Sequence, residues 1–260
     1  MKATSHDEIR RSVRTSYAAV AQSAVAGCGS PHSTCCNETS PAAAADIALA
    51  SGYKREDLAA APEDSNLGLG CGNPQLDGAI QAGETVLDLG SGAGFDCFLA
   101  GRAVGPNGQV IGIDMTAEMV HKARLNGTAS GVENVEFRLG EIEHLPVANE
   151  SVDLIISNCV INLSPEKERV LTEAFRVLKL GGRLAISDMV AHTDISEASR
   201  RDMDAYSGCV SGAVTAVELQ RILSHVGFEQ IRIQAKDAAL GSDQDLVFAA
   251  VLEATKPERS

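Results

Sequence analysis

Three alternating glycines stand between a short apolar stretch and a longer helical stretch, and this arrangement constrains the fold more than any other feature. Thr85–Leu89 has the length and composition of a buried strand, and Phe95–Val104 follows it as a helix. Gly90, Gly92 and Gly94 fill the turn between them. Glycine lets the backbone approach a ligand closely, and a helix N-terminus adds positive electrostatic potential. The sequence therefore predicts a ligand site at the start of this helix.

The rest of the chain repeats the alternation of strands and helices. We expect further strands at Gln109–Ile113, Val135–Arg138, Val152–Ser157, Arg183–Ser187, Gln230–Gln234 and Leu246–Leu252. We expect helices at 5–24, Ala42–Ala50, Glu56–Ala60, Ala117–Ser130, Lys167–Leu178 (ended by Gly181-Gly182) and Ala216–Val226. Such alternation predicts an α/β fold with a doubly wound, mostly parallel sheet of seven strands. The first helices form an N-terminal extension to it.

Acidic residues accompany the glycine loop at two places. Asp88 lies just before the first glycine, and Asp114 lies at the end of the second strand, twenty residues after Gly94. An acid at that second place can accept hydrogen bonds from both hydroxyls of a ribose. The dinucleotide-binding fingerprint requires a glycine where Phe95 stands. The alternating glycines instead resemble those of S-adenosylmethionine (SAM) methyltransferases.

That resemblance implies SAM as the cofactor and assigns residues to its site. The family places the residues after the third strand beside the adenine, and by position these are Gly140–Glu143. The implied cofactor-binding residues are Asp88, Gly90, Ser91, Gly92, Gly94, Asp114, Met115, Glu141, Ile142 and Asn158. The alternative, in which the glycines form only a tight turn, leaves the neighbouring strand, helix and acid unexplained.

The net charge excludes several classes of partner. Lys and Arg number 22 against 35 Asp and Glu, so the formal net charge is −13. Phosphate backbones and anionic membrane surfaces repel a chain this acidic, so we expect neither a nucleic-acid partner nor a membrane partner. No apolar run approaches the ~20 residues that a membrane-spanning helix needs.

Seven cysteines, an odd number scattered over 260 residues, do not form the framework of a secreted disulfide-rich protein. A reduced cytoplasmic protein that uses thiols for chemistry or metal binding fits better. The stretch Val25–Cys28 has the form of a lipoprotein cleavage site, but Gln22 and Ser23 interrupt the apolar segment before it. We therefore expect a cytoplasmic location.

Three of the cysteines lie in loops near the expected cofactor. Cys159 follows the fourth strand directly, where ligands bind in open α/β sheets. Cys71 stands between two glycines, and Cys209 lies in the loop before the helix at 216. Any one of them is as readily a buried structural cysteine as a ligand, and we expect Cys97 to be such a core residue. Three together indicate a thiophilic substrate, and zinc is the alternative, although the short Cys-x-x-Cys pairing of structural zinc sites is missing.

From about residue 60 to about residue 230, the sequence resembles arsenite methyltransferases. The matching motifs are Gly68–Pro74, Asp88–Asp96, Ile113–Thr116, Gly140–Glu143, Ser157–Pro165 and Gly208–Ala213. The resemblance implies trivalent arsenic, as arsenite or its thiol adducts, as the substrate and SAM as the methyl donor. Cys71, Cys159 and Cys209 would be the arsenic ligands and the catalytic residues. A reductant such as glutathione or thioredoxin would restore the thiols.

The family has a further cysteine toward the N-terminus that can pair with the one at position 71. Cys36 is the candidate for that redox partner of Cys71, and Cys28 and Cys35 compete for the role. Together with His32 these three cysteines are also a candidate metal cluster, for which a simple loop is the alternative.

On this resemblance the chain divides into three segments. Residues 1–60 are the N-terminal extension, residues 61–190 the SAM-binding core, and residues 191–260 an α+β portion that covers the arsenic site and adds the final strands. Two other functions share part of the pattern. A methyltransferase of an organic small molecule, of the quinone or sterol kind, needs the glycine loop but no cysteine triad. A non-catalytic thiol-based arsenic-binding protein needs the cysteines but no SAM, and as a sensor it would need a DNA-binding face, against which the net charge argues.

Overall fold

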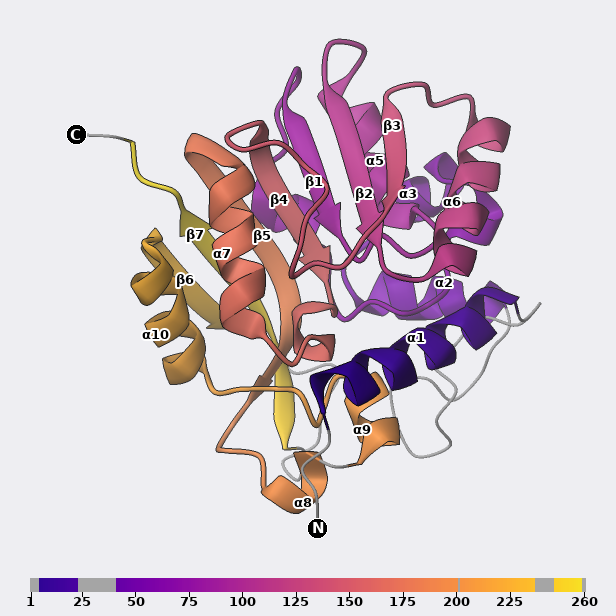
Figure 1. Ribbon diagram of the computed structural model, residues 1–260. Coiled ribbons are helices and arrows are strands. Elements are labelled where there is room, and N and C mark those ends of the chain that lie inside the picture. The colour runs from indigo at the N-terminus through magenta and orange to yellow at the C-terminus, as the bar shows by residue number, and fades with distance from the viewer. Residues whose placement is uncertain (1–4, 23–40, 201, 237–245, 259–260) are drawn as a thin grey trace.

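A seven-stranded sheet in the order β3-β2-β1-β4-β5-β7-β6 forms the centre of the molecule in the computed structural model, which describes residues 5–22, 41–200, 202–236 and 246–258 (Figure 1). Its strands are β1 (Thr85–Leu89), β2 (Gln109–Asp114), β3 (Val135–Leu139), β4 (Val152–Asn158), β5 (Leu178–Ala191), β6 (Glu229–Ala235) and β7 (Val247–Thr255). β7 is antiparallel to both of its neighbours, whereas β1 to β5 pair in parallel. The mostly parallel sheet predicted from the sequence is confirmed.

Helices cover both faces of this sheet. They are α1 (His6–Gln22), α2 (Pro41–Ala50), α3 (Arg55–Ala60), α4 (Pro74–Gly78), α5 (Phe95–Val104), α6 (Ala117–Ser130), α7 (Lys167–Val177), α8 (Glu197–Arg200), α9 (Met203–Ser207) and α10 (Ala216–Val226), with 3-10 turns η1 (Glu63–Ser65) and η2 (Ile161–Leu163). Figure 1 shows α7 and α10 on the near face of the sheet and α5 behind it. The sequence did not predict the short elements α4, α8, α9, η1 and η2.

Two aliphatic cores lie on opposite faces of the sheet, because successive side chains of a strand point to opposite sides. In β1, Leu87 and Leu89 pack with the side chains of α7 and α10, while Val86 packs with those of α5 and α6. Cys97 belongs to this second core and is fully buried, as predicted. The cores fix the ends of β1, β2 and β4 relative to one another, and the site is built there.

The boundary between α7 and β5 differs from the prediction. The helix ends at Val177, and β5 begins at Leu178, well before the predicted Arg183. Leu178 already pairs with Val152, and the register then shifts so that Leu154 faces Arg183. The glycines expected to end the helix lie inside this irregular part of the strand, where Gly181 has φ 75°. Glycine adopts such a backbone without steric cost, so the strand continues through it.

Helix α1 contacts α6 and α9 and crosses the lower part of the molecule in Figure 1. On the face of α1 that meets the rest of the molecule, Ile9, Val13 and Val20 are buried and Tyr17 is partly buried. Among the residues described, no helix is long and apolar enough to cross a membrane. The division of the chain at residues 60 and 190 stays a prediction, and β6 and β7 belong to the same sheet as the other strands.

Candidate functional site

A cavity lies where β1, β2 and β4 end, as the glycine loop predicts. Its lining includes Arg10, Val13 and Tyr17 of α1, the stretch 65–70, the loop residues Asp88, Gly90, Ser91 and Gly92, then Asp114, Met115 and Thr116, and finally Ile142, Glu143, Asn158 and Cys159. Eight of the ten predicted cofactor residues are in this lining. Gly94 and Glu141 are not.

The glycines of the loop have different roles. Gly90, Gly92 and Gly94 all have φ between 50° and 96°, in the left-handed region. A Cβ atom at Gly94 would lie 2.7 Å from the ring of Phe137, so this glycine allows α5 to pack on the sheet. A Cβ atom at Gly92 would meet nothing within 4 Å. The backbone at Gly92 therefore faces open space, as a surface that binds a ligand requires.

Two polar groups in the cavity retain unused hydrogen-bonding capacity. The Asp114 carboxylate accepts hydrogen bonds from the backbone N–H of Gly92 (3.0 Å) and of Thr116 (2.8 Å), which leaves lone pairs free. Ser91 Oγ is buried and has no hydrogen-bond partner within the described part of the chain. Since buried polar atoms normally have partners, both observations point to a ligand with hydroxyl or amino groups.

Buried carboxylates make this cavity suitable for a cation. Burial, the first cause, and the neighbouring Asp96 raise the pKa of Asp88 well above its usual range. Burial also raises the pKa of Asp96 and of Asp114. Tyr53 Oη donates to Asp96 over 2.6 Å and partly offsets that effect. A cation beside these carboxylates would offset the repulsion of Asp88 by Asp96 and Asp114, and SAM carries such a charge on its sulfonium together with a ribose that has two hydroxyls.

We expect Asp114→Ala to weaken SAM binding by roughly 1–3 kcal/mol, because the ribose hydroxyls lose a buried acceptor. Glu136→Ala is the matched control: it also removes one carboxylate, but from an exposed position of β3 paired with Arg138. Titration calorimetry with SAM measures both variants. Equal affinities for Asp114→Ala and wild type would remove Asp114 from the cofactor site.

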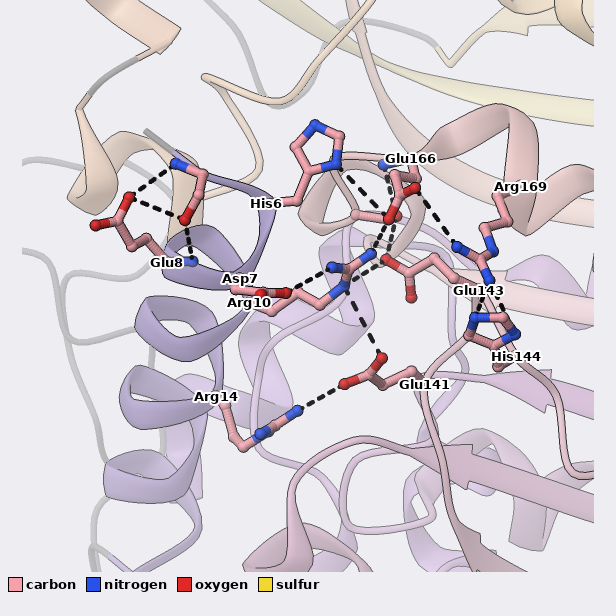
Figure 2. A network of polar contacts seen from close by, with 12 residues as sticks. His6, Asp7, Glu8, Arg10, Arg14, Glu141, Glu143, His144, Glu166 and Arg169 are labelled. Atoms are coloured by element: carbon pink, nitrogen blue, oxygen red, sulfur yellow. Dashed lines mark hydrogen bonds and ion pairs between the residues drawn. The ribbon is translucent and has the colours of Figure 1, made fainter. Parts of the chain in front are cut away.

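The side chain of Glu141 points toward α1 instead of the cavity. Figure 2 shows Arg14 reaching Glu141, and the distance from Nη2 to Oε1 is 2.9 Å. Arg10 binds the buried carboxylate of Glu143 through Nε (3.2 Å) and also pairs with Glu166. The ion pairs with Glu141 and Glu143 attach α1 to the segment after β3, and the pair with Glu166 attaches it to the residue before α7. Because α1 lines the cavity, Glu141 contributes to the position of this helix.

The three predicted arsenic ligands lie together at the edge of the cavity, whose lining includes Cys159 but not Cys71 or Cys209. Cys71 and Cys159 form a disulfide, with Cα atoms 6.0 Å apart. Cys209 Sγ donates a hydrogen bond to the Cys159 carbonyl over 3.1 Å. The residues are 88 and 50 positions apart in sequence. The fold thus brings together the three cysteines that the sequence singled out.

Both Cys159 and Cys209 have left-handed backbones, with φ 56° and φ 62°. Such a conformation costs roughly 1–2 kcal/mol for a residue with a Cβ atom. Strained residues of this kind concentrate at functional sites. For Cys159 the strain is maintained by its N–H, which donates to the Ser187 carbonyl over 2.8 Å. The two thiols are therefore held in place by their backbones.

Apolar side chains cover the cysteines. Ile9 and Val13 of α1 pack with Cys159, Cys209 and Tyr206 in one buried cluster. This cluster shields Cys159 and Cys209 from solvent, and each of them is only 6% exposed. The same helix that closes the cofactor cavity thus also covers the thiols.

The sequence predicted Cys36 as the partner of Cys71, with Cys28 and Cys35 as alternatives. These cysteines and His32 lie outside the described residues, so their pairing and the proposed metal cluster stay predictions. In the part of the chain that is described, Cys71 pairs with Cys159, a combination the sequence did not indicate.

Asp188 and Lys167 are functional candidates that sequence reasoning missed. A carboxylate oxygen of Asp188 lies within 4.8 Å of the Sγ atoms of both Cys159 and Cys209. Burial raises the pKa of Asp188 to about 6 and lowers the pKa of Lys167 to about 8. Asp188 follows the predicted fifth strand directly, so the rule that drew attention to Cys159 would also have found it.

We expect the stability of the protein to depend on Asp188 between pH 4 and pH 6. Its pKa rises from 3.8 to about 6 on folding. The folded state therefore keeps a proton that the unfolded state loses, and the free energy of unfolding falls as the pH rises through this window. Between pH 4 and pH 6, the free energy of unfolding of wild type should fall by roughly 3 kcal/mol relative to that of Asp188→Asn. Urea unfolding of both proteins at several pH values measures this, and a difference that does not change with pH would contradict it.

The sequence of this chain is similar to those of known methyltransferases. The family model described as "Methyltransferase domain" matches residues 80–227. An arsenite methyltransferase from Halobacterium salinarum is 47% identical over 97% of this chain and 68% of its own length. The human arsenite methyltransferase is 41% identical over 55% of this chain and 40% of its own length. The chain spans about half the length of another relative, the arsenite methyltransferase of Aquipseudomonas alcaligenes.

A solved structure shows the same likeness. The crystal structure of an arsenic(III) S-adenosylmethionine methyltransferase from Chlamydomonas reinhardtii is 31% identical in sequence to this chain, with a TM-score of 0.62. The match covers 83% of this chain and 73% of that one.

Proposed function

The chain belongs to the arsenite methyltransferase family, and we propose that it transfers methyl groups from SAM to trivalent arsenic held by the thiolates of Cys71, Cys159 and Cys209. The observation that carries this proposal is the convergence of three cysteines from distant parts of the sequence beside a cavity suited to a sulfonium cation. Soft thiolates are the ligands that a soft acceptor such as arsenic(III) prefers.

The thiols bind arsenite by exchange. Each thiol displaces one hydroxyl from As(OH)₃ and forms an As–S bond, and its proton leaves with that hydroxyl as water. Three such bonds make a pyramid whose arsenic lone pair points away from the sulfur atoms. Cys159 and Cys209 are already held in place by their backbones, so little rearrangement is needed to direct that lone pair.

Catalysis by this chain is mainly positioning. SAM supplies a methyl group on a sulfonium, from which a neutral thioether departs. The arsenic lone pair carries no proton, so no general base is required. Asp114 and the loop at Gly92 orient the methyl donor, while the apolar cluster with Ile9 and Val13 keeps water from the reacting atoms. Correct positioning can contribute ~7–11 kcal/mol in favourable cases.

The surface charge favours a neutral substrate. With a net charge of −13, the protein attracts no oxyanion such as arsenate. Arsenite is neutral at pH 7, as are its adducts with uncharged thiols. The proposed substrate is therefore arsenite or such an adduct.

The disulfide between Cys71 and Cys159 must be reduced before three thiols can bind arsenic. Two molecules of a thiol such as glutathione reduce it to two cysteine thiols and yield one glutathione disulfide. We expect oxidised protein to have no activity toward arsenite until such a thiol is added. Peptide mapping under non-reducing conditions, in parallel with the assay, follows the linkage. Full activity with the Cys71–Cys159 peptide still present would contradict this expectation.

Release of S-adenosylhomocysteine tests the proposed function against its alternatives. With SAM and glutathione present, arsenite should raise the release well above the rate without an acceptor. A quinone acceptor should leave that rate unchanged. Release with the quinone but not with arsenite would favour a methyltransferase of organic molecules. Arsenite binding without SAM binding would favour a non-catalytic arsenic-binding protein.

A further inference from the structure

The loop that carries Cys71 is attached to the end of β4 by one side chain. Asn158 Oδ1 accepts a hydrogen bond from the Cys71 backbone N–H over 2.9 Å. Asn158 Nδ2 donates to the Gly72 carbonyl over 2.8 Å. Both ends of a single carboxamide therefore hold consecutive residues of the loop. Because Asn158 directly precedes Cys159 in the chain, it connects the two cysteines that share the disulfide.

A buried polar network orients this carboxamide. Asn158 Nδ2 also donates to Tyr53 Oη over 3.1 Å, and Tyr53 Oη donates to Asp96 Oδ1 over 2.6 Å. Gln75 Nε2 donates to the same Asp96 oxygen over 3.0 Å. With Nδ2 directed to Tyr53 and Gly72, Oδ1 necessarily faces the Cys71 N–H. The opposite orientation of the amide would place two donors against each other.

The glycines on either side of Cys71 make this close contact possible. A Cβ atom at Gly70 would lie 2.6 Å from Asn158 Nδ2, closer than real contacts allow. At Gly72, a Cβ atom would lie 2.5 Å from Ser187 Oγ. The loop backbone thus approaches the end of β4 and its neighbour β5 more closely than any residue with a side chain could. The glycines that the sequence shows around Cys71 serve this attachment.

We infer that Asn158 is a positioning residue that holds the Cys71 thiol beside Cys159 after the disulfide is reduced. The hydrogen bonds involve the backbone of the loop and not its sulfur atom, so they do not require the disulfide. They keep two thiols that are 88 residues apart in sequence at a high effective concentration. This inference rests on the proposed function for its role in arsenic binding, but the thiol geometry itself can be tested without arsenic.

The inference predicts a shift in the thiol–disulfide equilibrium of Cys71 and Cys159. Two glutathione molecules reduce this bond and form one glutathione disulfide, and the equilibrium constant reports how close the two thiols are held. Asn158→Leu removes the hydrogen bonds of Asn158 to both Cys71 and Gly72, and Asn158→Asp removes only the donor to Gly72 among these two. In glutathione buffers, we expect the constant for disulfide formation to fall about tenfold or more in Asn158→Leu and less in Asn158→Asp.

Tyr53→Phe gives a second, milder variant, because it removes the hydroxyl that orients the carboxamide and leaves Asn158 intact. Asn134→Leu is the matched control. The Asn134 amide likewise donates to two backbone carbonyls, those of Gly101 in α5 and of Gly105 just after it, at 2.9 Å each. It lies outside the cofactor cavity, so its loss should not change the thiol equilibrium. Circular dichroism and urea unfolding of each variant show whether the protein is folded, since Asn158 and Tyr53 themselves line the cofactor cavity and their replacement can change SAM affinity directly.

Alkylation of free thiols followed by mass spectrometry measures the oxidised fraction. An equilibrium constant within twofold of wild type in folded Asn158→Leu would overturn the inference. So would an equal fall in Asn134→Leu. If Asn158→Leu does not fold, Tyr53→Phe decides: an unchanged constant there overturns the inference, and a fall supports it. Failure of wild type to methylate arsenite would refute the proposed function but would leave this measurement valid.

Discussion

Replacing Cys159 by serine should abolish methylation of both arsenite and monomethylarsenic(III), and Cys209→Ser should do the same. In the proposed mechanism, these residues supply the two thiolates that remain necessary when one methyl group already occupies the arsenic. Serine binds arsenic(III) much more weakly because its oxygen is a hard ligand. We expect a loss of about 10³-fold or more, as the loss of correct positioning implies.

Product formation from each arsenic substrate, resolved by chromatography, measures this loss. Cys97→Ala is the matched control, because it also removes a buried thiol, one that belongs to the core between α5 and the sheet. SAM affinity should stay near that of wild type in Cys159→Ser and Cys209→Ser. Substantial activity in either variant would show that its thiol is not an arsenic ligand.

Replacing Cys71 by serine should separate the two methylation steps. Arsenite offers three exchangeable positions and can engage all three cysteines, whereas monomethylarsenic(III) offers two. Cys71 is only partly buried, while Cys159 and Cys209 are buried in one apolar cluster and have left-handed backbones. We therefore expect Cys71 to be the ligand released. Cys71→Ser should lose about 10²-fold or more on arsenite and keep activity on monomethylarsenic(III).

Product formation from arsenite and from monomethylarsenic(III), resolved by chromatography, measures this prediction as well. Cys71→Ser cannot form the disulfide with Cys159, so its activity on monomethylarsenic(III) should not require prior reduction of that bond. Equal loss on both substrates, with SAM binding and folding intact, would refute the two-thiolate interpretation of the second step.

Much of the fold could be predicted from local patterns. β1 and α5 match their predicted bounds, because a buried apolar strand, a glycine turn and a helix leave little freedom. The position of Asp114 at the end of β2 was predicted for the same reason. The boundary at Leu178 was not, because a long-range pairing with Val152 overrides the helical pattern of the sequence there.

The candidate site was predicted in part. The convergence of Cys71, Cys159 and Cys209 follows from motifs and from the position of strand ends. The disulfide between Cys71 and Cys159 could not be predicted, since pairing depends on distances between segments 88 residues apart. The hydrogen bonds of Asn158 to the Cys71 loop could not be predicted either, because they too join segments that are far apart in the sequence.

Helix α1 shows what sequence patterns leave out. Ile9, Val13, Tyr17 and Val20 fall on one face of this helix by their spacing in the sequence, but nothing in that spacing indicates what the face covers. In the structure, the ion pairs of Arg10 and Arg14 with acids after β3 place this face over the thiols and the cofactor cavity (Figure 2).

The fate of the SAM methyl group tests the central claim most directly. Reduced protein is incubated with arsenite, glutathione and SAM whose methyl group carries three deuterium atoms, and the arsenic species are resolved by chromatography and mass spectrometry. We predict methylated arsenic in which every methyl group is an intact CD₃, formed in proportion to the S-adenosylhomocysteine released. Arsenic that remains bound to the protein but unmethylated, or S-adenosylhomocysteine released without labelled arsenic, would contradict the account.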